Sequence, residues 1–507
     1  MKEKRKMLLQ LASAGSLACL ILTGAAQAEP SQPESPLPKN TTPYSPYAVA
    51  DVPNQVFFGD THLHTAYSAD AGLVGAVRTP NDAVRFAKGE TVISNNGTPA
   101  RLKRPLDWLV VTDHAENLGL PIAIYESDPK LLANPWGKEI HDAFRRGTIE
   151  GMLTAYAMWS SASLDTMTDP LAQETELAKT MWRRITKTAD YHNVPGVFTA
   201  FIGFEWTLTP GGNNLHRNVI FRDASDRANA IVPLSAYDTQ DPQKLWDWME
   251  AYEKNTGGRI LALAHNGNLS NGLMFDDVTL VGNKPLDAAY AARRAKWEPI
   301  YEVTQIKGDG EAHPALSPDD EFADYGTWDN GSFGPDPKTP DMLPREYARS
   351  ALKRGLAYES KIGVNPFKFG LAGSTDSHTA LSTAGENNFF GKVAALEPSA
   401  DPMRFNEAIT GRTGTKAQQQ THAMALASGL AAVWARENTR EAIFAAFERK
   451  EVYATTGSRL RVRVFGGFDF DADDLSRSDF AAHGYANGAP MGGDLSKAPS
   501  GKAPSFL

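Results

Sequence analysis

The sequence predicts an α/β fold with a parallel sheet or an α/β barrel at its centre, over a chain of 507 residues. Short runs of apolar, β-branched or aromatic residues alternate with longer stretches of helical composition. Strands that are apolar throughout are typical of sheets buried on both faces. The predicted strands are residues 56–58, 106–111, 197–204, 218–221, 260–264, 300–303 and 367–372, and the predicted helices are residues 141–159, 171–190, 243–254, 286–297 and 439–450.

The two ends of the chain are expected to lie outside this barrel, which we assign to residues 51–458. Residues 1–28 have a basic start, an apolar run and a final Ala-Gln-Ala, which together predict a secretory signal peptide. Residues 29–50 are rich in proline and serine and predict an extended linker. The alternating residues 459–470 predict a two-faced strand that opens a small C-terminal β segment reaching residue 507, with a poorly ordered tail beyond about Asp494.

The net charge and the cysteine content of the chain disfavour some classes of function and some kinds of metal site. The formal net charge is −9, and removal of the basic signal peptide would make the chain more acidic, which disfavours binding to nucleic acid or anionic membranes. The single cysteine, Cys19, lies in the signal peptide, so the mature chain can form neither disulfides nor thiolate metal sites. A metal site must therefore use His, Asp and Glu, which suits Zn, Mn or Fe. The apolar run is also too short for a membrane span.

Metal-capable side chains follow five of the predicted strands at their carboxyl ends. These residues are His62 and His64, Asp113 and His114, Glu205, His265, and Asp376 and His378. Alternate side chains of an extended segment point to one side, so His62 and His64 can converge on one ion. In α/β barrels the loops at the carboxyl ends of the strands form the active site. The pattern therefore predicts a metal centre at that edge, which His216 can join from the loop after Glu205.

The motifs around these residues resemble those of a known superfamily. "DTHLHTAYSAD", "VTDH", "GFEW", "AHN" and "STDSH" are similar to the ordered metal-binding motifs of the PHP (polymerase and histidinol phosphatase) superfamily. The longer motifs "IKGDGEAHP", "GLAGSTDSHTALS" and "GAPMGGDL" resemble the DUF3604 family of exported bacterial proteins. The resemblance implies a distorted (βα)7 PHP-like barrel with a trinuclear metal centre that hydrolyses phosphoesters.

The resemblance also implies which residues hold each metal ion. The first site would use His62, His64, Glu205 and Asp376, the second Glu205, His216 and His265 with Glu205 as the bridge, and the third Asp70, His114 and His378. Asp70 departs from the pattern, because some superfamily members carry histidine there, so the third site should be weaker or prefer a harder metal. The chain also ends soon after "MGGDL", where DUF3604 proteins usually continue, so we expect a truncated or frameshifted C-terminus.

Several other polar residues have two interpretations each. Arg217 and Lys307 would either bind a substrate anion or form ordinary salt bridges. Asp60 and Asp113 would either orient the ligand imidazoles, which we favour, or cap the strand ends. His313 is interpreted as a loop histidine rather than a general acid. No role is expected for His141, His192, His422 and His483, and Trp246 and Trp248 are expected in the core.

Together these features predict an exported metal-dependent hydrolase acting on a small anionic substrate, most simply a phosphoester. Two or three divalent ions per chain would activate water, with Glu205, Asp376, Arg217 and Lys307 as the catalytic residues. An amidohydrolase-type reaction on a cyclic amide or lactone is the alternative, although it would typically need a carboxylated lysine at a strand end, where only Lys307 is available. A non-catalytic protein with a vestigial metal site is the third interpretation.

The signal peptide leads to the first testable prediction. Mature protein isolated from the periplasm or the culture medium should begin at Glu29, because the Ala-Gln-Ala sequence places the cleavage site after Ala28. N-terminal sequencing or intact mass measurement checks this. A soluble cytoplasmic product that keeps residues 1–28 would contradict it.

Overall fold

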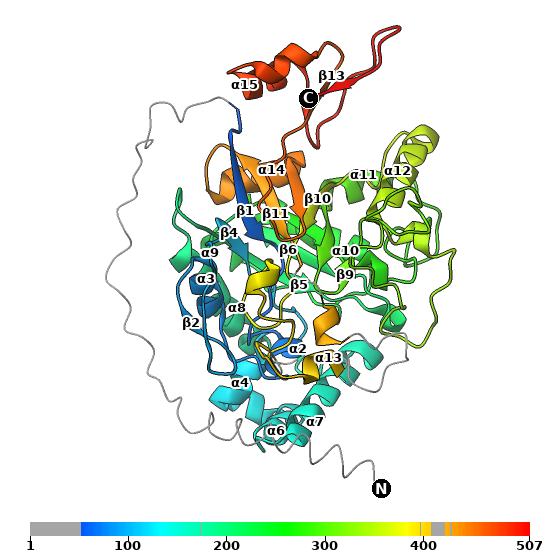
Figure 1. The fold of residues 1–507 in the computed structure, drawn as a ribbon. Helices are drawn as coiled ribbons and strands as arrows, with labels where there is room; N and C mark the ends of the chain where they lie inside the picture. Colours follow the sequence, from blue (N-terminus) through cyan, green and yellow to red (C-terminus); the bar gives the residue numbers. More distant parts are fainter. Residues whose placement is uncertain (1–51, 173, 396, 407–420, 426–427) are drawn as a thin grey trace.

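A curled mixed sheet forms the centre of the protein in the computed structural model, which describes residues 52–172, 174–395, 397–406, 421–425 and 428–507 (Figure 1). The expected signal peptide and linker lie outside these residues. The strands of the sheet follow the order β10-β8-β7-β6-β5-β4-β1-β11-β12, with β9 (Gly308–Asp309) paired to β8. Their bounds are β1 Gln55–Asp60, β4 Trp108–Val110, β5 Thr199–Trp206, β6 Arg217–Phe221, β7 Ile260–Ala264, β8 Ile300–Gln305, β10 Gly370–Gly373, β11 Leu430–Ala435 and β12 Val452–Thr455.

Strand direction explains why the metal-capable residues share one edge. Strands β1, β4 and β5 are mutually parallel, and so are β7, β8 and β10. Strand β6 runs antiparallel to both of its neighbours, β5 and β7, so the two parallel groups point the same way. The alternation of strands and α-helices is interrupted at this point, because β5 leads into β6 without an intervening α-helix. The reversal places the beginning of β6 beside the carboxyl ends of the other strands.

The sheet curls until its two ends meet. The amide of Gly429, just before β11, donates a hydrogen bond of 3.1 Å to the carbonyl of Ser374, just after β10. A Cβ atom at Gly373 would lie 2.9 Å from the carbonyl oxygens of both Leu430 and Thr455, which is too close for any side chain. Glycine at this position therefore allows β10 to approach β11 and β12. The sequence analysis predicted neither β11 nor β12 as a strand.

Apolar side chains from the inner face of the sheet form a core that helix α14 (Arg440–Arg449) closes at one end. Phe444 and Phe447 of α14 belong to the same buried cluster as strand residues such as Trp108, Phe201 and Leu263. The Trp108 and Phe447 rings meet edge to face with centroids 5.5 Å apart. This inner core supports the strands from which the metal-capable side chains extend.

The outer face of the sheet is covered by helices, and a second apolar cluster lies between them and the strands. The remaining helices are α2 Ala69–Gly72, α3 Pro80–Ala87, α4 Leu120–Glu126, α5 Pro129–Ala133, α6 Pro135–Phe144, α7 Ile149–Ser160, α8 Thr175–His192, α9 Ser225–Ala228, α10 Pro242–Thr256, α11 Ala288–Trp297, α12 Ala348–Ile362, α13 Met403–Asn406 and α15 Phe480–Asn487. Trp246 and Trp248 pack in this layer, as expected. Among the described helices, none is long and apolar enough to cross a lipid bilayer.

Two helix predictions need correction. The single helix expected over residues 141–159 is broken between α6 and α7, where Gly147 takes a positive φ of 65° and Thr148 caps α7 by accepting a hydrogen bond from the Gly151 amide. Helices α3 and α12 were not predicted, although α3 begins with a capping box formed by Thr79 and Asp82. The other predicted helices form within a few residues of the expected bounds.

The C-terminal segment forms a small unit at the end of the sheet opposite the metal-capable residues (Figure 1). The strand expected over residues 459–470 is wrong in extent, because only β13 (Phe465–Gly467) pairs with other strands. The prediction of a poorly ordered tail beyond about Asp494 is also wrong, because β15 (Ser505–Phe506) pairs with β13. Strand β14 (Ala489–Pro490) pairs with β13 as well. The unit contacts the main sheet through the Trp434 indole, which donates a 2.8 Å hydrogen bond to the Val462 carbonyl.

Deletion of residues 495–507 should therefore lower the melting temperature by a few degrees. The deletion removes β15 together with the paired hydrogen bonds of 2.9 Å between the backbones of Phe465 and Leu507, each of which contributes on the order of 1 kcal/mol. Differential scanning calorimetry of the deletion variant checks this, with Lys497→Ala as the control because that side chain is exposed. An unchanged melting temperature after deletion would show that β15 does not stabilise the unit.

Candidate metal centre

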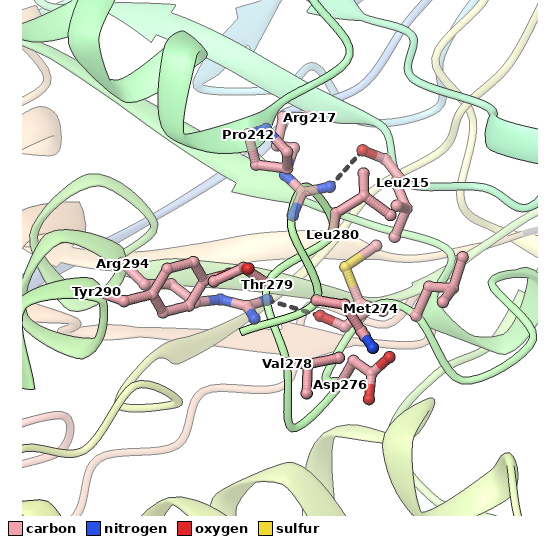
Figure 2. Close-up of a pocket in the computed structure, with 12 residues that line it drawn as sticks. Leu215, Arg217, Pro242, Met274, Asp276, Val278, Thr279, Leu280, Tyr290 and Arg294 are labelled. Atoms are coloured by element: carbon pink, nitrogen blue, oxygen red, sulfur yellow. Dashed lines mark hydrogen bonds between the residues drawn. The ribbon is translucent and has the colours of Figure 1, made fainter. Parts of the chain in front are cut away.

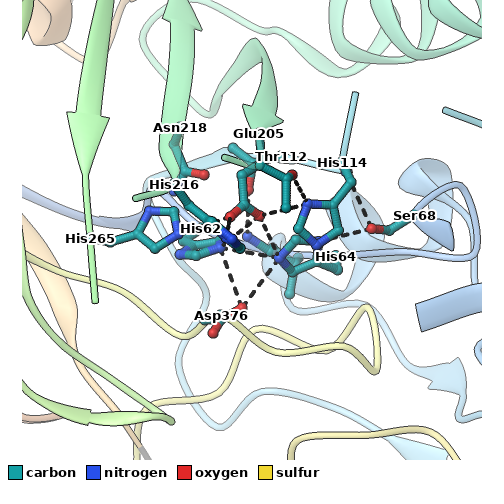
Figure 3. Close-up of polar contacts among 12 residues, drawn as sticks. His62, His64, Ser68, Thr112, His114, Glu205, His216, Asn218, His265 and Asp376 are labelled. Carbon is teal, nitrogen blue, oxygen red and sulfur yellow. Dashed lines mark hydrogen bonds and ion pairs between the residues drawn. The ribbon is translucent and has the colours of Figure 1, made fainter. Parts of the chain in front are cut away.

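The metal-capable side chains project from the inner face of the sheet because of the period of two along each strand. Phe201 and Gly203 of β5 precede Glu205 on one face, and Leu261 and Leu263 of β7 precede His265 in the same way. Each ligand thus continues a row of core residues beyond the last apolar layer. Figure 3 shows the imidazoles of five of these residues gathered around the Glu205 carboxylate.

Glu205 lies between two groups of side chains and directs one oxygen to each. Its Oε2 lies 3.4 Å from His62 Nε2 and 3.2 Å from His64 Nε2. Its Oε1 lies 2.6 Å from His216 Nδ1 and 2.9 Å from His265 Nε2. A carboxylate in this position can serve two cations at once, which is the geometry of a bridging ligand.

The first group is completed by Asp376, which follows β10. Its Oδ1 lies 3.3 Å from His62 Nε2 and 3.2 Å from His64 Nε2, and these two nitrogens are 3.1 Å apart. The four side chains are all at most 1% exposed. The structure thus brings together the four residues expected at the first metal site, and the three expected at the second.

A third group forms around Asp70 on helix α2. Asp70 Oδ2 lies 3.1 Å from His114 Nε2 and 2.6 Å from His378 Nε2. The ligand atoms of these residues and of His64 all lie within 4.8 Å of one another. The Asp70 side chain is 16% exposed, more than the other members. This group is therefore the one nearest to solvent.

The donor set fits divalent cations. Glu205 Oε2 and Asp376 Oδ1 are buried carboxylate oxygens with no hydrogen-bond partner, and both point at the imidazole nitrogens of His62 and His64. An ionised oxygen in this position is strongly destabilised unless a cation compensates it. Imidazole and carboxylate together suit Zn, Mn or Fe. The residues present therefore fit divalent metal ions.

A family model described as "Protein of unknown function (DUF3604)" matches residues 51–507. The chain belongs to the DUF3604 family. No curated protein matches it. A distantly similar solved structure, a two-domain protein from Bacteroides vulgatus ATCC 8482 containing a predicted PHP-like metal-dependent phosphoesterase, is 10% identical, with 82% of this chain and 80% of that chain covered at a TM-score of 0.32.

Two lysines of this DUF3604 protein contact Asp376 through Oδ2, the oxygen that does not face His62 and His64. Lys307 Nζ forms an ion pair with Asp376 Oδ2, and Lys392 Nζ lies 3.3 Å from the same oxygen. Gln305 Nε2 donates a further hydrogen bond of 2.8 Å to it. Lys307 thus lies beside the candidate metal ligands, in a buried ion pair. Lys392 was not predicted, because it lies in an irregular segment 16 residues after Asp376.

Glu302 is a second residue that the sequence analysis missed. It lies on β8, buried, with its two oxygens 3.1 and 3.3 Å from His62 Nδ1, the nitrogen that faces away from the other ligands. A carboxylate in this position fixes the ring orientation and the tautomer of a ligand histidine. An acidic residue inside the apolar run "IYEV" was the available signal, because only a paired carboxylate is stable there.

Asp60 and Asp113 do not orient imidazoles, contrary to the interpretation that we favoured. Asp60 accepts hydrogen bonds from the amides of His62 (3.1 Å) and Thr375 (3.0 Å) and from the Ser382 hydroxyl (2.6 Å). Asp113 accepts from the amide and the hydroxyl of Thr65 at 2.6 and 2.8 Å. Burial raises the pKa of both carboxyl groups to about 6. Asp60 thus links the segment after β1 to the segment after β10, and Asp113 links the segment after β4 to the segment after β1.

Arg217 and His313 lie away from the cluster. Arg217 of β6 lies opposite Trp206 of β5 in the sheet. Its Nε lies 3.1 Å from Glu298 Oε1, so its side chain is on the opposite face of β6 from His216. The expected contact of Arg217 with a substrate at the metal centre is therefore not supported. His313 lies 2.9 Å from Asp329 in a loop, in agreement with its interpretation as a loop histidine.

Burial and charge act in opposite directions on the ligand imidazoles. Burial lowers the pKa of His216 and of His378 to about 3 in each case, despite the carboxylate beside each ring. At His114 burial also lowers the pKa, but the negative charges of Asp70 and Glu205 outweigh it and raise the pKa to about 9. A proton on His114 therefore offsets carboxylate charge in the metal-free protein, and a bound cation would displace it.

Added Mn²⁺ should stabilise the protein more at pH 9 than at pH 6.5. The raised pKa of His114 stabilises the metal-free fold below its ordinary value of 6.5, and this contribution is lost as the pH rises through about 9. A metal ligand must be neutral, so binding releases this proton, and the affinity rises by up to about tenfold per pH unit between these values. Melting temperatures of chelator-treated protein with and without Mn²⁺ test this. Equal gains at both pH values would contradict the assignment of His114 as a ligand.

Proposed function

We propose that this protein is a metal-dependent hydrolase of phosphoesters with a PHP-like, distorted barrel and a multinuclear metal centre. The observation that carries the proposal is the placement of Glu205, whose two oxygens face two separate imidazole groups. Bound divalent ions would supply Lewis-acid activation of water and neutralise charge on a phosphoryl group. The nine residues of the expected ligand set are His62, His64, Asp70, His114, Glu205, His216, His265, Asp376 and His378.

The chain's own residues would position the ions and the substrate. Glu302 holds His62, and the Ser68 hydroxyl lies 3.1 Å from His64 Nδ1, so both ligand rings are fixed from behind. Asp376 is held by Lys307, Lys392 and Gln305 through its other oxygen. The ligands would therefore be preorganised, which limits the cost of assembling the site when substrate binds.

Lys307 favours an anionic substrate. The negative charges of Asp376 and Glu205 raise the pKa of Lys307 even though burial acts to lower it, so its ammonium group stays charged at neutral pH. A phosphoryl oxygen close to Asp376 would meet this charge as well as the metal ions. Neither lysine bridges the imidazole groups as a carboxylated lysine would. This arrangement supports phosphoester over cyclic amide or lactone hydrolysis.

We also propose that the protein acts outside the cytoplasm. The support comes from the sequence of residues 1–28 and from the lack of cysteine in the remainder of the chain.

Glu205→Gln should remove at least one metal ion per chain and lower the rate of phosphoester hydrolysis by about a hundredfold or more. The substitution keeps the volume of the side chain but removes the negative charge that faces both imidazole groups. Metal analysis of the purified protein and a panel of phosphomonoesters and phosphodiesters provide the measurements. Failure of the wild-type protein to hydrolyse any of the panel with Zn, Mn or Fe bound would contradict the proposed substrate class.

Two matched variants control for non-specific effects. Glu139→Gln makes the same change on an exposed position of α6, and His141→Ala removes an imidazole that contacts Ser127 at 3.1 Å, away from the cluster. Both should keep wild-type metal content and activity. A Glu205→Gln variant with a full complement of metal and normal turnover would show that Glu205 does not bridge two ions.

A further inference from the structure

A cavity of about 100 Å³ lies on the outer face of strand β6, against helix α11 (Figure 2). Arg217 of β6, Tyr290 and Arg294 of α11, and the loop of residues 273–283 line it. Because Arg217 and His216 are adjacent in an extended segment, they point to opposite sides. The cavity and the metal centre therefore lie on different faces of the same strand.

Two buried guanidinium groups at this cavity share one carboxylate. Arg217 Nε lies 3.1 Å from Glu298 Oε1, and Arg294 Nε lies 3.2 Å from Glu298 Oε2. Arg217 and Arg294 are 3% and 5% exposed. Asp276, the acidic residue in the lining, is paired with Arg345 at 3.0 Å. Arg217 and Arg294 therefore have the single carboxylate of Glu298 between them, because Asp276 is already paired with Arg345.

Each of the two buried guanidinium groups keeps a nitrogen for a ligand. Arg217 donates through Nη1 to the Leu215 carbonyl, and Arg294 donates through Nη2 to the Met274 carbonyl at 2.8 Å. Among the described residues, neither Arg217 Nη2 nor Arg294 Nη1 has a hydrogen-bond acceptor. The Arg294 guanidinium also lies over the Phe367 ring, 5.0 Å from its centroid, which fixes its position. These two nitrogens can therefore donate hydrogen bonds to an anion in the cavity.

We propose that this cavity binds a small oxyanion, either a phosphate group or a carboxylate. Its volume is about three times the ~30 Å³ share of one water molecule and well below the roughly 300–1,000 Å³ of sites for larger organic ligands. Guanidinium groups match the planar or tetrahedral array of oxyanion oxygens through paired N–H donors. The site is independent of the proposed hydrolase activity, because it uses none of the metal-ligating residues.

Titration of the chelator-treated, full-length protein with inorganic phosphate, and separately with acetate, tests the site. We expect saturable binding of at least one of the two anions by isothermal titration calorimetry, with a matching rise in melting temperature. Saturation by phosphate would support a phosphoryl group as the occupant, and saturation by acetate alone would support a carboxylate. Saturation by neither would overturn the proposal.

Variants locate the binding at this cavity. Arg294→Gln should weaken it at least tenfold, whereas Arg293→Gln should not, because Arg293 points to Asp247 at 2.6 Å on the surface. If Arg294→Gln does not fold, Leu280→Trp fills the cavity from its wall without removing a charge and should also abolish binding. Glu205→Gln should bind the anion as the wild type does. Equal binding by wild type and by the folded cavity variants would overturn the proposal.

Discussion

The burial of the Glu205 carboxylate inside the curled sheet is the constraint on which the rest of the site depends. An ionised group at the end of a fully buried strand is strongly destabilised unless positive charge lies close to it. In the metal-free protein protonated imidazoles supply positive charge on the Oε2 side, where nearby carboxylates raise the pKa of His62 and His114 against the effect of burial. On the Oε1 side burial lowers the pKa of His216 and His265, so these rings are neutral, as metal ligands must be. The centre is therefore electrostatically prepared for cations before any bind.

Strand polarity and the period of two within each strand were sufficient to predict much of this site from the sequence. His62, His114, Glu205, His265 and Asp376 each follow an apolar run, and runs of this kind tend to end at one edge of a sheet. Asp70, the candidate ligand nearest to solvent, came from the family resemblance instead. It lies on a short helix whose position depends on tertiary contacts that no local pattern reveals.

The remaining differences arise where long-range packing decides the outcome. Strands β11 and β12 close the sheet through a glycine contact with β10, and nothing in their own residues indicates a partner far away in the chain. Lys392 approaches Asp376 from an irregular segment. Arg217 follows a ligand histidine directly, yet alternation along β6 turns it to the other face and into an ion pair with Glu298. Adjacency in sequence was misleading here because the segment is extended.

The apolar core behind the candidate metal centre limits the routes by which a molecule can reach the cluster. Phe444 and Phe447 of α14 fill the interior of the sheet at the end away from the ligands, together with Trp108 and its neighbours. Among the described residues, apolar side chains thus fill this end of the interior. A substrate of the proposed hydrolase would therefore reach the cluster from the opposite end of the sheet, and its product would leave by that same end and compete with it.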